Sequence, residues 1–211
     1  MSLSYNSVMR NNSKSISTFL SKYLAWIYVV GGALGLAAAF VLTLEKIELL
    51  KDPAHQLSCS LNPVLSCGSI IGSDQASAFG FPNPFIGIAG FSVVITIGMA
   101  IFAGAKFKKW FWQGLQIGSL LGVIFVHWLI HESLYEIGAL CLYCMLVWSV
   151  TMPIFWYTTL RNINEGDLIM VKSESLKKFI FDHHLDILVS WYVIVIVLIL
   201  VRFWYYWSTV I

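Results

Sequence analysis

Five long apolar stretches limit what this chain can fold into more than any other feature of its sequence. They cover residues 24–44, 84–104, 110–130, 140–160 and 185–207. At a rise of about 1.5 Å per residue, a helix of about twenty residues crosses the roughly 30 Å hydrocarbon core of a bilayer. A helix also satisfies its backbone polar groups within its own segment, as lipid requires. The sequence therefore predicts an all-α integral membrane protein with five transmembrane helices.

The composition excludes other classes of protein. Of the 211 residues, 58% are hydrophobic and 11% are charged, which lies far outside the range of a soluble domain. The formal net charge of +2 is too small to indicate a nucleic-acid partner. The first stretch lacks a small-residue cleavage site, so we expect a retained span and a mature chain that begins near Met1.

The basic residues predict the orientation in the membrane, because cytoplasmic loops carry an excess of lysine and arginine. They are Arg10, Lys14 and Lys22 before the first stretch, Lys106, Lys108 and Lys109 between the second and third, and Arg161, Lys172, Lys177 and Lys178 between the fourth and fifth. The loop at 45–83 has two lysines offset by acidic residues, and the loop at 131–139 has none. We therefore expect a cytoplasmic N-terminus and an outer C-terminus. Arg202 near the outer end is an exception whose long side chain can reach the interface.

This orientation places all four cysteines on one side of the membrane. Cys59 and Cys67 lie in the long outer loop, and Cys141 and Cys144 lie at the outer end of the fourth stretch. Disulfides persist outside the cytosol, so every thiol faces a compartment that permits disulfide chemistry. Two neighbouring thiol pairs can pass a disulfide between them through a mixed disulfide. The arrangement predicts a redox relay.

The C-x-x-C pair of Cys141 and Cys144 opens a predicted helix. Free N–H groups and the helix dipole stabilise a thiolate at this position. A permanent structural disulfide is one alternative, but a separation of three residues closes almost no loop entropy. Half of a zinc site is another, with His131, Glu132 and Glu136 nearby, although zinc usually needs further histidine or cysteine ligands. We favour a redox-active pair and expect no metal.

Cys59 and Cys67 enclose a turn signal, Asn62-Pro63, that disfavours a continuous helix and lets the two cysteines approach bridging distance. Taken alone, this pair is typical of a loop-stabilising disulfide. Beside the C-x-x-C pair, it could instead carry a disulfide between a soluble partner and the membrane site. Both interpretations stay open on the residues alone.

Three features in order resemble the vitamin K epoxide reductase family in its bacterial form. They are Cys59 with Ser66-Cys67, the segment Gly80-Phe81-Pro82-Asn83-Pro84-Phe85-Ile86-Gly87 that leads into the second stretch, and the C-x-x-C pair that opens the fourth. The resemblance implies a four-helix bundle around a quinone pocket, with an additional fifth helix. It divides the chain into a cytoplasmic segment at 1–23, a redox domain at 24–160 with its outer loop at 45–83, a cytoplasmic linker at 161–184, and the fifth helix with the C-terminus at 185–211.

The resemblance also implies a function. Bacterial members of the family oxidise a thioredoxin-like protein and pass the electrons to a membrane quinone, here ubiquinone or menaquinone. Cys59 and Cys67 would exchange with this partner, Cys67 would link transiently to Cys141, and Cys144 would face the quinone. The implied location is the bacterial inner membrane, with a periplasmic active site. Many relatives carry a fused thioredoxin-like domain, whereas this chain stops at Ile211, so we expect the partner in trans.

Three residues are candidates for contact with the quinone. Asn83 matches the family position that hydrogen-bonds a quinone carbonyl. Phe85 and Trp148 are aromatic candidates, and Trp148 stands where vertebrate relatives have a tyrosine; its indole can stack and donate a hydrogen bond but cannot accept one. His127, near the outer end of the third stretch, is a candidate proton donor or acceptor. The alternative function is a non-enzymatic membrane protein with structural disulfides or metal-binding thiols.

Overall fold

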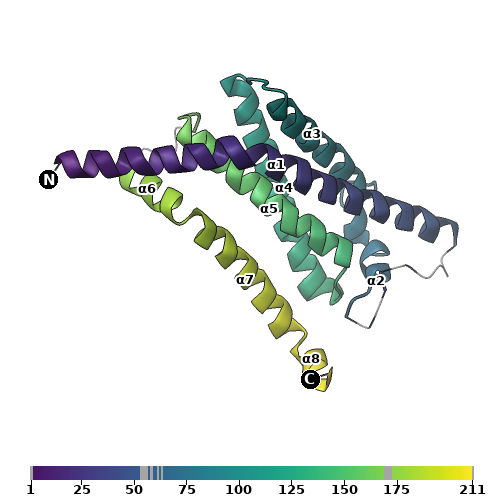
Figure 1. Ribbon diagram of the computed structural model, residues 1–211. Coiled ribbons are helices and arrows are strands. Elements are labelled where there is room, and N and C mark those ends of the chain that lie inside the picture. Colours follow the sequence, from purple (N-terminus) through teal and green to yellow (C-terminus); the bar gives the residue numbers. More distant parts are fainter. Residues whose placement is uncertain are drawn as a thin grey trace.

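The computed structural model describes residues 2–52, 57, 59–60, 62, 64–168 and 173–210, with side chains described from Ile16 to Ser208 within these ranges. Within them the chain is all-α and contains no strand. The long helices are α1 (Ser2–Lys51), α3 (Pro84–Phe102), α4 (Lys109–His131), α5 (Leu142–Asn164) and α7 (His184–Arg202) (Figure 1). The short helices are α2 (Cys67–Ile71), η1 (Asp74–Ser77), η2 (Glu132–Ile137), α6 (Glu174–Asp182) and α8 (Trp204–Val210).

Four of the described helices are long and apolar enough to cross a membrane, namely α1 from Ile16, α3, α4 together with η2, and α7. They make the chain an integral membrane protein. The fourth expected span, at 140–160, is the 23-residue helix α5, which is long enough but less apolar. It packs against both α1 and α4, and polar side chains such as Thr151, Thr158 and Asn162 are buried along it. A helix enclosed by its neighbours can carry such groups because they find partners within the bundle.

Helix α1 is far longer than the span expected at 24–44. Its 50 residues reach about 75 Å, so it continues beyond the membrane-spanning part at both ends. Small residues bring it close to α3: a Cβ atom on Gly35 would lie 2.5 Å from the ring of Phe91, and one on Gly98 would lie 2.9 Å from the Cβ atom of Tyr28. Glycine is needed at such positions because the two backbones approach closely.

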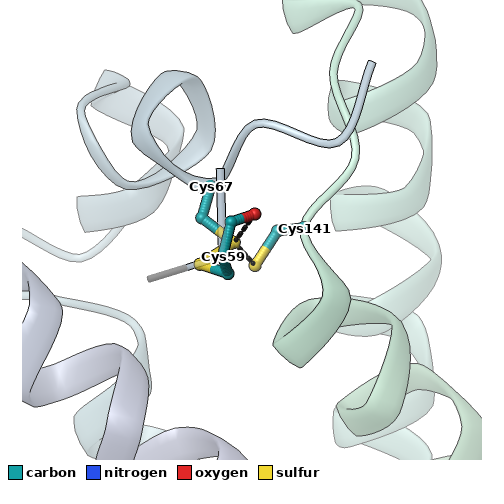
Figure 2. A group of neighbouring side chains, drawn as sticks. All are labelled: Cys59, Cys67 and Cys141. Carbon is teal, nitrogen blue, oxygen red and sulfur yellow. Dashed lines mark hydrogen bonds between the residues drawn. A yellow bond between two sulfur atoms is a disulfide. The ribbon is translucent and has the colours of Figure 1, made fainter. Parts of the chain in front are cut away.

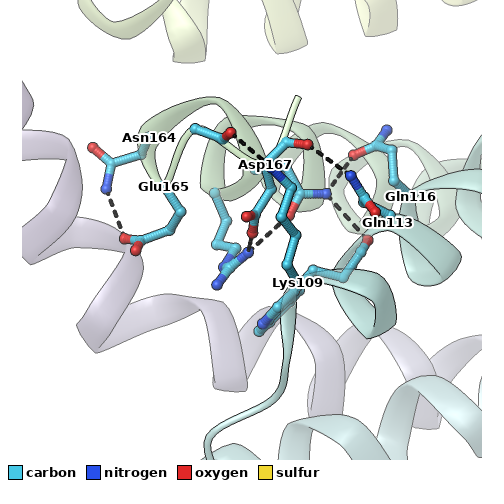
Figure 3. A network of polar contacts seen from close by, with 10 residues as sticks. Lys109, Gln113, Gln116, Asn164, Glu165 and Asp167 are labelled. Carbon is cyan, nitrogen blue, oxygen red and sulfur yellow. Dashed lines mark hydrogen bonds and ion pairs between the residues drawn. The ribbon is translucent and has the colours of Figure 1, made fainter. Parts of the chain in front are cut away.

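A polar network joins α4 to α5 at the end of the bundle where α4 begins (Figure 3). Arg161 forms an ion pair with Asp167 and lies 4.0 Å from the centre of the Trp112 ring. The wholly buried Asn162 donates from Nδ2 to the backbone oxygen of Trp112 at 3.2 Å and to Oε1 of Gln116 at 3.1 Å. The polar side chains of this network are thus hydrogen-bonded to one another.

Helix α7 runs along the outside of the four-helix bundle (Figure 1). The indole N–H of Trp191 donates to Nε2 of His127 on α4 at 2.9 Å, while Nδ1 of His127 lies 2.8 Å from the carbonyl oxygen of Val123. At the far end of α7, Nε of Arg202 donates to the carbonyl oxygen of Leu134 at 2.7 Å. The charge pattern predicts that this end of α7 is outside the cytoplasm, where a basic residue is unexpected. The hydrogen bond to Leu134 gives Arg202 a partner there.

Candidate active site

Three cysteine sulfurs meet where α2 approaches the start of α5 (Figure 2). Cys59 and Cys67 form a disulfide with their Cα atoms 5.6 Å apart. Sγ of Cys141 lies 3.2 Å from Sγ of Cys67, and all three residues are buried. The two predicted cysteine pairs are therefore in direct contact at one end of the bundle, and the disulfide that the loop sequence allows is present.

Backbone hydrogen bonds hold the loop cysteines against the C-x-x-C segment. Oδ1 of Asn62 accepts from the backbone N–H groups of Val64 and Leu65, which forms the turn expected at Asn62; Pro63 lies outside the described residues. Beyond this turn, the N–H of Leu140 donates to the oxygen of Val64 at 2.8 Å, and the N–H of Ser66 donates to the oxygen of Leu140 at 2.9 Å. These two bonds place Cys67 beside Cys141.

Cys141 is the N-cap residue of α5. The backbone N–H of Cys144 donates to Sγ of Cys141 at 3.4 Å, so this sulfur faces the open N-terminus of the helix. The free N–H groups and the positive end of the helix dipole stabilise a thiolate there. Because a thiolate is the attacking species in thiol–disulfide exchange, Cys141 is placed to exchange with the disulfide at Cys67.

The cluster of three sulfurs also has the size of a metal site. Among the residues that the structure describes, Cys59, Cys67 and Cys141 are the group of three potential ligands whose donor atoms all lie within 4.8 Å. In the observed state two of these sulfurs share a disulfide, whereas zinc binds cysteine as the thiolate. The site therefore favours disulfide exchange over metal binding in this state.

An apolar cavity of about 870 Å³ lies between α1, α3, α4 and α5 and is partly open at the outside of the bundle, where exposed side chains such as Val93 and Leu121 line it. Its volume falls in the range of pockets for small ligands, roughly 300–1,000 Å³. Cys144 forms part of its wall, together with Val147 and Trp148 about one turn further along helix α5, whereas Cys141 does not. The C-x-x-C pair thus joins two environments: Cys141 contacts the loop disulfide, and Cys144 faces the cavity.

Two of the three predicted quinone contacts line this cavity. Trp148 is only 3% exposed, and its Nε1 has no hydrogen-bond partner among the described residues. Asn83 also lines the cavity, but its side chain braces the preceding loop: Oδ1 accepts from the N–H of Ala78, and Nδ2 donates to the oxygen of Gln75. Phe85 is 45% exposed and lies outside the lining. Contact of these residues with a quinone stays a prediction.

Glu132 and Ser133 also line the cavity, although the sequence pointed to Glu132 only as a potential metal ligand. The available signal was an ionisable residue directly after an apolar stretch, a position that is often functional. His127 lies outside the lining, and its ring is engaged with Trp191. Its proposed proton role stays a prediction.

The fold and the site together define an all-α membrane protein whose thiol–disulfide centre adjoins an apolar cavity. The model of the vitamin K epoxide reductase family matches residues 26–159, and the chain belongs to this family. The resemblance found over residues 24–160 is thereby confirmed. No curated protein matches the sequence. Family membership, with the contact between the two cysteine pairs, makes the protein a membrane thiol oxidoreductase.

Proposed function

We propose that this protein oxidises an extracytoplasmic thioredoxin-fold protein and transfers the two electrons to a membrane quinone, so that it generates disulfides. The observation that carries the proposal is the distance of 3.2 Å between Sγ of Cys67 and Sγ of Cys141. It connects the disulfide of the loop to a dithiol whose second member faces an apolar cavity.

The electrons would follow the order of the cysteines. The dithiol of the partner reduces the disulfide of Cys59 and Cys67, and the partner leaves with a disulfide of its own. Cys67 then attacks an oxidised C-x-x-C pair at Cys141, and Cys59 resolves the mixed disulfide, which returns the loop disulfide and leaves Cys141 and Cys144 reduced. The structure holds this last distribution, with the loop pair oxidised and the C-x-x-C pair reduced. It is the state that would donate electrons to an acceptor.

The residues around the cavity fit a quinone. A quinone bound there would supply a two-electron acceptor, which matches the two electrons released when Cys141 and Cys144 form a disulfide. Cys144 lies in the wall, the indole N–H of Trp148 has no partner among the described residues and can donate to a carbonyl oxygen, and Asn83 has a second N–H on Nδ2. The lining is otherwise largely apolar, as an isoprenoid quinone from the bilayer requires. Ubiquinone and menaquinone both satisfy this chemistry.

The proposed location is the bacterial inner membrane, with the cysteines in the periplasm and the partner in trans. The charge pattern supports it: Lys106 and Lys108 lie between α3 and α4, Lys109 begins α4, and Lys177 and Lys178 lie on α6, all at the end away from the cysteines. Lys172 and the side chains of Arg10 and Lys14 lie outside the described residues. The N-terminal segment at 1–23 and the linker at 161–184 are accordingly proposed to be cytoplasmic.

Purified protein in lipid vesicles tests the proposal. Reduced thioredoxin-fold oxidase is added as electron donor and a short-chain ubiquinone or menaquinone analogue as acceptor, and quinol formation is followed by absorbance. We expect quinol and partner disulfide in equal amounts, with no quinol when the donor is omitted. A preparation that binds metal stoichiometrically through reduced thiols, and transfers no electrons, would instead support the non-enzymatic alternative.

A further inference from the structure

Glu132 brings a carboxyl group into the wall of the apolar cavity. Its side chain is 14% exposed, whereas that of the preceding His131 is 59% exposed. Nδ1 of His131 lies 3.8 Å from Oε1 of Glu132. Two consecutive residues therefore lead from the surface at the cysteine end to the cavity that Cys144 lines.

The backbone explains why Glu132 faces inward. Helix α4 ends at His131 and continues as the six-residue π-helical turn η2, whose wider winding changes the direction of its side chains. Such turns often occur at functional sites. The turn is anchored where Oγ of Ser133 donates to the oxygen of Ala139 at 2.5 Å, and it ends at Gly138, whose φ of 70° is left-handed. Glu136 in the same turn is exposed and lies outside the cavity lining.

Quinone reduction has a proton requirement that the cysteines do not meet alone. Disulfide formation between a Cys141 thiolate and a Cys144 thiol releases two electrons but only one proton, whereas conversion of a quinone to a quinol takes up two electrons and two protons. One further proton must reach the cavity. A carboxyl group in contact with both the cavity and a surface histidine is suited to this transfer.

We propose that Glu132 is the proton donor of the cavity and that it is reprotonated from the outer aqueous phase along its contact with His131. This inference rests on the proposed quinone reductase function. In the balanced step, the Cys141 thiolate and the Cys144 thiol become a disulfide, the Cys144 proton and the Glu132 proton end on the two quinone oxygens, and Glu132 is left as a carboxylate. A proton from the outer phase then restores its carboxyl group.

His127 is a further ionisable side chain near this end of α4. Its Nε2 accepts a hydrogen bond from Trp191, its Nδ1 faces a backbone carbonyl, and it lies outside the cavity lining. The geometry therefore favours Glu132 over His127 as the group that delivers a proton.

The variants Glu132→Gln and Glu132→Asp test the proposal in the full-length protein in vesicles. Glutamine keeps the shape but cannot transfer a proton, so we expect kcat for quinone reduction to fall by about 100-fold, with KM for the quinone analogue almost unchanged. Aspartate should restore part of kcat. The rate at which the reduced partner opens the disulfide of Cys59 and Cys67 should stay at the wild-type value, and Glu136→Gln is the matched control with wild-type kcat.

Infrared spectroscopy gives a readout that does not depend on turnover. On addition of a non-reducible quinone analogue, we expect a shift in a protonated-carboxyl band that is missing in Glu132→Gln and retained in Glu136→Gln. A wild-type kcat in Glu132→Gln, or a carboxyl band that is the same in that variant, overturns the proposal. If the wild-type protein reduces no quinone, the proposed function fails, and the infrared band alone then decides whether Glu132 carries a proton that responds to a ligand in the cavity.

Discussion

The two ends of the helical bundle use polar groups in opposite ways. At one end, Arg161, Asp167 and Asn162 satisfy one another and their neighbours in a closed network. At the other end, Cys141 touches a disulfide without being bonded to it, and the buried indole N–H of Trp148 has no partner among the described residues. A network in which the polar groups are hydrogen-bonded to one another holds the helices in place. Groups without such partners remain able to react with a molecule or to bind it.

The backbone also differs between the two ends of the bundle. At the network end a short connection joins α3 directly to α4, while α2, η1 and the π-helical turn η2 gather at the cysteine end. Helical periodicity alone could not bring the loop disulfide to the start of α5 and turn Glu132 toward the cavity. The irregular segments orient the side chains of the site. The polar network at the opposite end holds the helices in position.

The largest expected effect comes from Cys144→Ser at the reactive end. Turnover should be lost, because a dithiol is needed to supply two electrons, and a mixed disulfide between Cys67 and Cys141 should accumulate. Non-reducing electrophoresis and mass spectrometry of the linked peptides detect it. Cys141→Ser is the matched control, which should also lose turnover but form no mixed disulfide. Full activity of both variants would contradict the relay.

The second prediction concerns the polar network at the end of the bundle where α4 begins. Arg161→Ala leaves Asp167 unpaired in a mostly buried position, so the free energy of unfolding should fall by about 3 kcal/mol. Unfolding by sodium dodecyl sulfate in mixed micelles, followed by tryptophan fluorescence, measures the loss. Lys177→Ala breaks an exposed ion pair with Glu174 and should cost less than about 0.5 kcal/mol. Equal losses in the two variants would show that the network has no special structural role.

A third prediction concerns the middle of the bundle, where α1 meets α5. The hydroxyl of Thr158 donates to the oxygen of Ile154, so the hydroxyl of Tyr28 is the donor in its 2.6 Å hydrogen bond to Thr158. Tyr28→Phe removes this buried hydrogen bond and should lower the free energy of unfolding by about 1 kcal/mol in the same assay. Tyr23→Phe, at an exposed position on the same helix, should leave it unchanged.

The smallest expected effect belongs to Trp148→Phe at the cavity. Phenylalanine keeps an aromatic ring but removes the N–H, so KM for the quinone analogue should rise by about threefold, as expected for one weak hydrogen bond. Trp207→Phe is the control, because Nε1 of Trp207 is likewise buried without a partner among the described residues but lies outside the cavity lining. An unchanged KM in Trp148→Phe would remove the indole from the ligand contacts.

The helices were largely predictable because their signals are local. Pro84 is well suited to the first turn of a helix, and α3 begins there as the apolar stretch predicted. The stretch at 110–130 became α4 with nearly the same bounds, but its extension into a π-helical turn was not predicted. Since the turn decides that Glu132 faces the cavity and Glu136 does not, periodicity could not distinguish the two glutamates. The hydrogen bond from Trp191 to His127 was also not predictable, because it depends on how α7 packs against α4.

The sequence by itself determined that this is a helical membrane protein, where most of its long helices lie in the chain, and that both cysteine pairs lie at the same end of the bundle. These features follow from the hydrophobic length of each segment and from the charges beside it, which are local properties. The tertiary structure decided which sulfur meets which. Two backbone hydrogen bonds between residues 64–66 and Leu140, far apart in the chain, bring Cys67 to Cys141, and the packing of α5 turns Cys144 into the cavity. Such contacts depend on how distant segments fit together, which no local pattern specifies.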